Sequence, residues 1–329
     1  MSVPAIRFHD AAPEEAGLRR AVLQGLRRRP KAIPPKFFYD AGGSRLFDAI
    51  CRQPEYYLTR TEESILRRHA GEIAELAGTG TLLIELGSGA SRKVRLLLEA
   101  LRPATYMGVD ISRDFLVAAA RRLAGDYPWL DVHATCMDFS RGLALEHCPS
   151  GLPRLAFFPG SSIGNFEPPQ AQELLGDLAR VVGPGGALLI GVDLKKDRAL
   201  LDAAYNDAAG VTAEFNCNLL RRMRDELGAT LDLAGFRHHA FYNGRRGCIE
   251  MHLVSRARQR IAIDGEEFEL DAGETIHTES SYKYTVAEFT ALAARAGYSP
   301  ARVWTDPQNL FSVHYLVAER PLGRTGQGA

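Results

Sequence analysis

A carboxylate, a glycine loop and a second carboxylate lie close together in the sequence and could bind a nucleotide. Glu85 follows the apolar residues 82–84, and Gly87 and Gly89 come directly after it. Glycine lets the backbone approach a ligand closely, and a helix that begins after such a loop offers its N-terminus to the ligand. A second apolar run ends at Asp110, about 20 residues further on, where a ribose-binding carboxylate is expected.

The loop departs from the dinucleotide fingerprint, which has a third glycine for close packing of the helix on the strand. Arg92 stands at that position, so NAD is disfavoured. A carboxylate before a looser glycine pattern resembles the S-adenosylmethionine version of the site instead. Asp110 could also be a cap of the helix expected from about Ser112, because Asp is a good N-cap, but its spacing favours a ribose ligand.

Two further stretches follow expected strands and could complete such a site. Asp138 and Phe139 come after the strand expected at 131–135. In class I methyltransferases an acidic or polar residue there meets the adenine amino group and an apolar one flanks the ring; a capping Asp and a core Phe are the alternative. Residues 157–168 would lie over the methyl group, and they lack the N-P-P-Y or D-P-P-Y motif of enzymes that methylate planar nitrogens.

The same stretch contains G-x-S-x-G, which could be the nucleophile elbow of a serine hydrolase with Ser162 as nucleophile and His314 in a triad. An elbow leads directly into a helix, whereas Pro168 and Pro169 delay the next helix here. A hydrolase would also leave the adenosine-site pattern unexplained, so this alternative is disfavoured.

No metal site is expected from the histidines. His238 and His239 would point to opposite faces of a strand, and no carboxylate accompanies the histidines at a helical spacing of i, i+4. We interpret them as core or surface residues.

Alternating strands and helices must position these groups. Strands are expected at 82–84, 105–110, 131–135, 155–158 and 187–193, and helices at 91–101, 112–124 and 170–182. This order predicts a parallel sheet with right-handed crossovers. Residues 1–60 are expected to form a helical cap outside the sheet. An insert follows with helices at 198–206 and 212–227, strands at 237–242, 248–256, 259–263 and 274–280, and a turn region at 265–273. A helix at 286–296 and strands at 301–305 and 311–318 close the chain.

The pattern predicts an α/β protein in which residues 61–195 and 286–329 form a Rossmann-like domain, and residues 1–60 and 196–285 form a second α+β domain. The 329 residues suit one large or two modest domains. The chain has 40 basic residues (Lys and Arg) and 40 acidic residues (Asp and Glu). This balanced charge gives no reason to expect electrostatic attraction to nucleic acid or to a membrane. The five cysteines are scattered and the N-terminus is no signal peptide, so a cytoplasmic location is expected.

Motifs along nearly the whole chain resemble one family, the histidine Nα-methyltransferases of ergothioneine biosynthesis. They include ELGSG at 85–89, FPGSSIGNF at 158–166 and TESS at 278–281. The other matching segments are residues 38–40, 54–62, 193–197, 205–207, 212–216, 250–255 and 311–315. Cys217 stands where an apolar residue is expected. The resemblance implies a class I methyltransferase, a monomer with the substrate between its two domains, which trimethylates the α-amine of L-histidine to hercynine.

The resemblance also implies the residues of both sites. S-adenosylmethionine would be held by Gly87, Lys93, Asp110, Asp138 and Phe139. Asn165 and Tyr205 would hold the substrate carboxylate, Tyr39 and Gly160 would lie near the amine, Tyr56 would lie beside the amino acid, and Met251, Glu279 and Ser281 would surround the imidazole. Tyr39, Asn165 and Tyr205 are the candidate catalytic residues. Members that act on another amino acid, and a non-catalytic regulator that binds S-adenosylmethionine, are the remaining alternatives.

The reaction explains why these residue types are needed. Methyl transfer from a sulfonium is an in-line displacement, so positioning supplies most of the acceleration. The attacking amine must be neutral, and a tyrosine or water could take its proton. Aromatic faces such as Tyr39, Tyr56 or Phe215 could stabilise the methylated cation by roughly 0.5–2 kcal/mol each.

Overall fold

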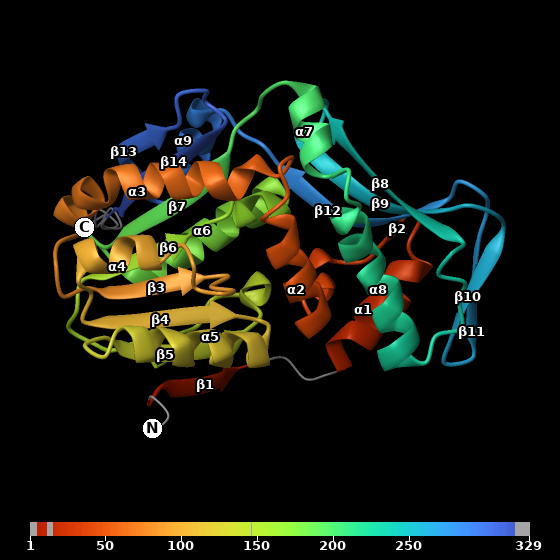
Figure 1. Cartoon of the computed structure of the whole chain (residues 1–329), viewed down its shortest axis with the longest axis horizontal. Coiled ribbons are helices and arrows are strands. Elements are labelled where there is room, and N and C mark those ends of the chain that lie inside the picture. Colours follow the sequence, from red (N-terminus) through yellow and green to blue (C-terminus); the bar gives the residue numbers. More distant parts are fainter. Residues whose placement is uncertain (1–4, 12–15, 146, 320–329) are drawn as a thin grey trace, which may run out of the picture.

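The computed structural model describes residues 5–11, 16–145 and 147–319. Its main feature is an eight-stranded sheet in the order β1-β5-β4-β3-β6-β7-β14-β13 (Figure 1). These strands are β1 (Arg7–Ala11), β3 (Leu82–Leu86), β4 (Thr105–Asp110), β5 (Asp131–Met137), β6 (Arg154–Phe158), β7 (Ala187–Asp193), β13 (Tyr298–Thr305) and β14 (Phe311–Ala318). All pairings from β1 to β7 are parallel, while β14 is antiparallel to β7 and to β13. This confirms the expected class I methyltransferase sheet.

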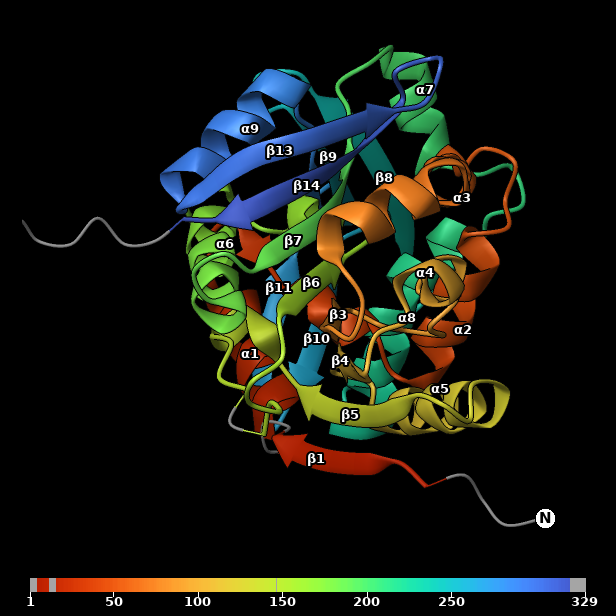
Figure 2. The same ribbon diagram turned by 90° about the vertical axis from the view of Figure 1, so that its left-hand side faces the viewer.

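Helices cover both faces of this sheet (Figure 2). One face carries α3 (Tyr57–Ala77), α4 (Arg95–Leu101) and α5 (Arg113–Asp126), and the other carries α6 (Pro168–Val182) and α9 (Val286–Arg295). The strands are therefore buried on both sides, as the continuous apolar run of β3 requires. Side chains alternate along it: Leu83 joins the core on one face, whereas Leu82 and Ile84 join the core on the other.

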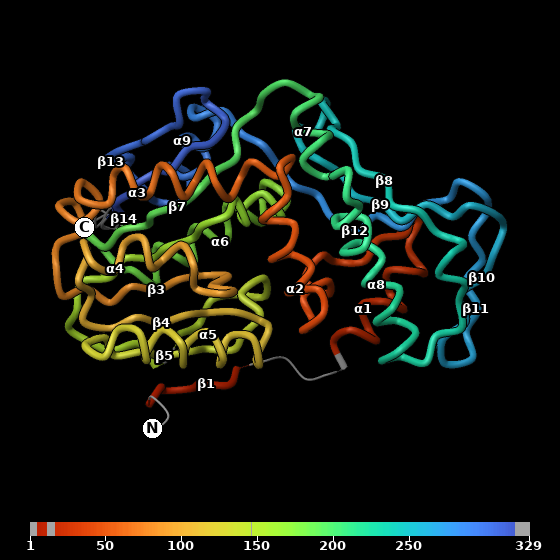
Figure 3. Tube along the Cα trace, viewed as in Figure 1, coloured from red at the N-terminus to blue at the C-terminus, as the bar shows by residue number. Residues whose placement is uncertain are grey.

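The rest of the described chain packs beside the carboxyl ends of the parallel strands (Figure 3). It contains a four-stranded sheet in the order β2-β12-β9-β8 and the hairpin β10-β11. The strands are β2 (Lys31–Ala32), β8 (Phe236–Asn243), β9 (Cys248–Ser255), β10 (Gln259–Ile263), β11 (Glu266–Leu270) and β12 (Thr275–Tyr282). The helices are α1 (Ala16–Arg27), α2 (Ala41–Ile50), α7 (Arg198–Ala204) and α8 (Val211–Leu227), with 3-10 helices at Pro35–Phe38, Phe139–Arg141 and Ser162–Asn165.

The expectation that residues 1–60 form a helical cap outside the main sheet is wrong for residues 7–11. Residues 7–11 form β1, which pairs with β5 at the edge of the main sheet, and residues 31–32 form β2 in the smaller sheet. Because β1 is mostly exposed and β2 has two residues, neither has the apolar run that identifies a strand. The second domain therefore does not include all of 1–60.

Two other elements differ from expectation. The first helix after the glycine loop begins at Arg95 rather than 91, because Ser91 has a φ of 51° and cannot be helical. The region 265–273 contains β11 rather than turn alone. Asp264 and Gly265 have φ values of 55° and 80°, as a two-residue hairpin turn requires, so the Asp-Gly pair was the signal for this hairpin.

Candidate active site

The glycine loop and Asp110 form one local structure at the carboxyl ends of β3 and β4. Gly87 and Gly89 have φ values of 63° and 50°, which favour glycine. The Gly89 N–H donates to Asp110 Oδ2 across 2.9 Å, and the Ser112 N–H donates to Oδ1 across 2.9 Å. Burial raises the pKa of Asp110, although these backbone donors lower it. Each carboxylate oxygen keeps a free acceptor direction, so the fold can hold Asp110 in place and still offer it to a ribose.

The residues expected to bind the cofactor line one cleft. It runs along the carboxyl ends of β3, β4 and β5, and its walls include all five of them, Gly87, Lys93, Asp110, Asp138 and Phe139. Lys36 reaches this cleft from the N-terminal part of the chain, and its Nζ lies 2.6 Å from Asp138 Oδ2. The Phe139 ring packs edge-on against Phe158, with centroids 5.9 Å apart. Apolar and carboxylate surfaces therefore meet where an adenine would lie.

A buried carboxylate that was not expected from the sequence links Lys93 in this cleft to the loop at Gly160. Glu62 on α3 has its Oε2 2.5 Å from Lys93 Nζ, and it accepts the Gly160 N–H across about 2.9 Å. Gly191 faces it, where an added Cβ would lie 1.9 Å from Glu62 Oε1. Only a glycine on β7 leaves room for this carboxylate.

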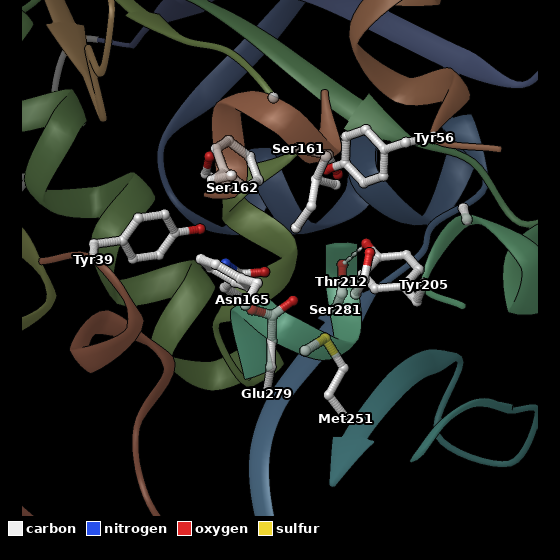
Figure 4. A pocket seen from close by; sticks show the side chains of 15 residues that line it. Tyr39, Tyr56, Ser161, Ser162, Asn165, Tyr205, Thr212, Met251, Glu279 and Ser281 are labelled. Carbon is white, nitrogen blue, oxygen red and sulfur yellow. Dashed lines mark hydrogen bonds between the residues drawn. The ribbon is translucent and has the colours of Figure 1, made fainter. Parts of the chain in front are cut away.

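The residues expected to bind the substrate also come together (Figure 4). A pocket between the two sheets is lined by all eight of them, Tyr39, Tyr56, Gly160, Asn165, Tyr205, Met251, Glu279 and Ser281. They come from separate elements: Gly160 and Asn165 follow β6, Met251 is on β9, and Glu279 and Ser281 are on β12. Glu279 pairs in register with Met251, so the two side chains lie next to each other on one face of the small sheet.

Further residues line the pocket beyond the eight assigned to the substrate, and of these Phe215 was expected as an aromatic face. Phe47 and Ile50 on α2, Thr212 on α8, and Ala204, Ser161 and Ser162 also line it, as does Phe215. The amphipathic pattern of α2 predicts that Phe47 faces the core, where it is partly buried, but nothing in the sequence alone directs it toward a ligand.

The substrate pocket opens into the cofactor cleft. Six residues line both, Tyr39, Phe47, Tyr56, Gly160, Ser162 and Asn165. A methyl donor in the cleft and an amine in the pocket would therefore meet at a shared wall, without passing through solvent. In-line transfer requires this arrangement.

The pocket combines one acidic group with several phenols. Glu279 is the only carboxylate among the described residues that line it, and burial raises its pKa to about 7 although Lys283 lowers it. Burial also raises the pKa of Tyr39 and Tyr56 well above the usual range, and that of Tyr205 to a lesser extent. These tyrosines stay protonated, so they serve as hydrogen-bonding and aromatic groups rather than as bases.

The comparisons with known proteins agree with this geometry. Residues 18–318 match the family described as histidine-specific methyltransferase, SAM-dependent. The chain belongs to this family. It is 43% identical over 314 residues to the histidine N-alpha-methyltransferase of Mycolicibacterium smegmatis, covering 94% of this chain and 96% of that protein. The Mycobacterium tuberculosis protein of the same name is 42% identical, with 91% and 95% covered. Ergothioneine biosynthesis protein 1 of Neurospora crassa is 33% identical, and the match covers 88% of this chain and 34% of that protein.

Family membership confirms the resemblance and makes S-adenosylmethionine the cofactor. The cleft suits it, because a buried carboxylate, an open glycine loop and an apolar wall all face the same space. S-adenosylmethionine has hydroxyls, an adenine and a charged methionine end, and each has a partner of matching chemistry there.

The serine hydrolase alternative lacks its geometry. Ser162 Oγ donates to the carbonyl of Pro159 across 3.1 Å, while His314 is buried on β14 with its Nε2 2.9 Å from Ser312 Oγ. The helix after Ser162 is a single 3-10 turn, and α6 begins at Pro168, two residues before the expected start. Ser162 therefore has neither the base nor the elbow of a nucleophile.

In residues 5–11, 16–145 and 147–319, no group of three His, Cys, Asp or Glu side chains has a metal-binding arrangement. Within the same ranges, none of the helices is both long enough and apolar enough to cross a membrane.

Proposed function

We propose that this chain transfers methyl groups from S-adenosylmethionine to the α-amine of L-histidine, up to three times, and so forms hercynine in ergothioneine biosynthesis. The observation that carries the proposal is a pocket that joins the cofactor cleft and contains Glu279 and Ser281 on the same strand face. A carboxylate and a hydroxyl two residues apart on a strand can pair with both nitrogens of an imidazole. The relatives named for histidine methylation support the same substrate.

The substrate carboxylate is assigned to Asn165 and Tyr205. Asn165 ends the 3-10 helix after β6, and Tyr205 caps α7, so the two come from opposite sides of the pocket. An amide N–H and a phenolic O–H are both donors, as a carboxylate requires. Gly160 and Tyr39, on the wall shared with the cofactor cleft, are assigned to the amine.

Bound S-adenosylmethionine supplies an electrophilic methyl on a sulfonium, and the chain positions the amine against it. The amine must lose a proton before each transfer. Because the tyrosines keep their own protons, water in the open cleft is the proposed acceptor. The rings of Tyr39, Phe47 and Phe215 pack against one another, with centroids 5.4–6.0 Å apart, and all three line the pocket that would hold the methylated ammonium. Cation–π attraction then stabilises the methylated product by roughly 0.5–2 kcal/mol for each ring.

The protein is further proposed to act as a monomer in the cytoplasm, on a small-molecule substrate and without a nucleic-acid or membrane partner. The five cysteines are free thiols, which is the usual state in a reducing compartment. The balanced charge supports the absence of a nucleic-acid partner.

The test is incubation with S-adenosylmethionine and each of the twenty amino acids, followed by mass measurement. Histidine should gain up to three methyl groups, and the others little. Methylation of a different amino acid would mean that the assigned substrate is wrong and that the assigned reaction, methyl transfer to an amine, still holds. No methylation of any of them would contradict the proposed function and favour a regulator that binds the cofactor.

A further inference from the structure

A fully buried lysine lies behind the substrate pocket without lining it. Lys283 is 1% exposed and stands two residues after Ser281 on the chain. Its Nζ lies 2.8 Å from Asp193 Oδ2, 2.9 Å from Tyr205 Oη and 2.9 Å from Ser281 Oγ. An ammonium has three donors and no acceptor, so these three contacts use all of its protons.

The two hydroxyls that receive these protons also bond to each other. Tyr205 Oη and Ser281 Oγ are 2.9 Å apart, and both line the substrate pocket. Each hydroxyl has one proton to donate and two lone pairs. Since Lys283 fills one lone pair on each, the direction of the bond between them decides what each offers to a ligand.

Only two arrangements are then possible. If Ser281 donates to Tyr205, both lone pairs of Tyr205 are filled, its own proton points to the ligand, and Ser281 keeps one free lone pair. If Tyr205 donates to Ser281, the roles reverse. A carboxylate accepts protons and cannot bind a hydroxyl that offers only a lone pair. A carboxylate at Tyr205 therefore selects the first arrangement and makes Ser281 an acceptor.

We propose that Lys283 is a positioning residue that couples recognition of the substrate carboxylate by Tyr205 to recognition of an imidazole N–H by Ser281. This rests on the proposed function, because it needs a substrate that has both groups. It assigns the N–H of the bound ring to Ser281. Glu279 then faces the other ring nitrogen, and it accepts from an imidazolium or, when protonated, donates to a neutral ring.

The surroundings of Asp193 hold Lys283 in its charged form. Asp193, at the end of β7, is fully buried and also accepts from Tyr57 Oη across 2.9 Å and from Lys196 Nζ across 2.5 Å. Its backbone N–H donates to Ser161 Oγ across 2.9 Å, and Ser161 lines the pocket with a φ of 56°. The network therefore connects the main sheet to both walls of the pocket.

Lys196 provides a matched control, because it pairs with the same carboxylate but does not contact Tyr205 or Ser281. Replacing Lys283 by methionine leaves Asp193 with Lys196 and Tyr57 as partners, so no unpaired carboxylate is created. The two variants Lys283→Met and Lys196→Met thus remove the same charge from the same cluster.

The experiment measures kcat and KM for L-histidine and the Kd of S-adenosylhomocysteine by calorimetry. Lys283→Met should raise the KM for histidine about tenfold to a hundredfold, the usual effect of losing a hydrogen bond to a charged group. The Kd of S-adenosylhomocysteine should stay within about twofold, because Tyr205 and Ser281 do not line the cofactor cleft. Lys196→Met should change the KM much less than Lys283→Met, because Lys196 contacts neither of these two hydroxyls.

A double-mutant cycle with Tyr205→Phe separates positioning from packing. The proposal expects Tyr205→Phe to raise the KM strongly in the wild type and much less in Lys283→Met, since the proton direction is already lost there. Additive effects, an unchanged KM in Lys283→Met, or an equal loss of histidine and S-adenosylhomocysteine binding would each overturn it. If Lys283→Met does not fold, Lys283→Gln is tested by the same criteria. Failure of the wild-type protein to methylate histidine would refute the proposed function before any variant is compared.

Discussion

Glu62 and Lys93 form an ion pair inside the protein, with Nζ 2.5 Å from Oε2 and the Glu62 side chain fully buried. Burial lowers the pKa of Lys93, but the adjacent charge and hydrogen bond of Glu62 outweigh it and raise the pKa. The same carboxylate accepts the Gly160 N–H, so it holds both the lysine assigned to the cofactor and the loop assigned to the substrate.

Removing Glu62 should therefore affect both stability and binding. Glu62→Ala leaves Lys93 buried without a partner, which costs about 3–5 kcal/mol in comparable buried pairs. Glu62→Gln keeps an acceptor for Gly160 and should cost less. Urea unfolding of both variants measures this, with Glu75→Ala, an exposed acid on the same helix, as control. Equal stability of Glu62→Ala and the wild type would show that the pair is not needed.

Asp110 should control cofactor affinity. Its free acceptor directions face the cleft, and its fixed orientation comes from Gly89 and Ser112. Asp110→Ala should remove most of the affinity for S-adenosylmethionine and S-adenosylhomocysteine, while circular dichroism stays unchanged. Asp114→Ala, in the first turn of α5, is the control for loss of an acid near this helix. Calorimetry that finds the same Kd for Asp110→Ala would rule out the ribose assignment.

The carboxylate assignment predicts poor use of histamine. Histamine keeps the amine and the imidazole but lacks the group assigned to Asn165 and Tyr205. Its kcat/KM should fall by orders of magnitude relative to histidine, because a site built for hydrogen bonds rejects ligands that leave them unmade. Tyr205→Phe should reduce the preference for histidine over histamine. Methylation of histamine at a comparable rate would place the carboxylate elsewhere.

The sequence predicted most of the main sheet, because its strands are apolar and alternate with helices. It could not predict β1, whose residues are largely exposed and are held by pairing with β5. The members of the two sites came mainly from motif resemblance. Glu279 and Ser281 could be placed on one face from their spacing alone, but Lys283 and Asp193 could not be connected, because their contact depends on how two sheets pack. Tyr57 and Asp193 are likewise 136 residues apart.

Glu279 should make stability depend on pH in the absence of substrate. Burial raises its pKa to about 7 from an ordinary value of 4.5. Between these values the folded protein keeps a proton that the unfolded chain releases, so the free energy of unfolding falls as pH rises through this window. Glu279→Gln has no titrating group at this position, so its free energy of unfolding should not fall for this reason as pH rises. Relative to the wild type, it should gain stability from pH 5 to pH 8 in urea unfolding, whereas Glu267→Gln on the exposed hairpin is the control. A difference that does not change with pH would mean that Glu279 is not protonated at neutral pH.

The same residue should decide the choice of amino acid. Glu279 lies beside Met251 at the end of the pocket, and among the described lining residues it is the one acid available to an imidazole. An apolar or indole side chain leaves this buried carboxylate without a partner. Sites built around hydrogen bonds reject ligands that lack them by roughly 10⁴–10⁵-fold. The wild type should therefore have a far higher kcat/KM for histidine than for leucine, phenylalanine or tryptophan.

Glu279→Ala removes both the attraction to histidine and the penalty for other side chains. Activity on histidine should fall sharply, while the gap to tryptophan should narrow, since the pocket then presents a methyl group next to Met251. The measurement is kcat/KM for histidine and tryptophan with both proteins, with the Kd of S-adenosylhomocysteine as evidence that the cofactor cleft is intact. Since Glu279 lines the substrate pocket and not the cofactor cleft, that Kd should not change. An unchanged ratio of the two kcat/KM values would show that Glu279 does not recognise the side chain, and the assignment of histidine would then rest on the relatives alone.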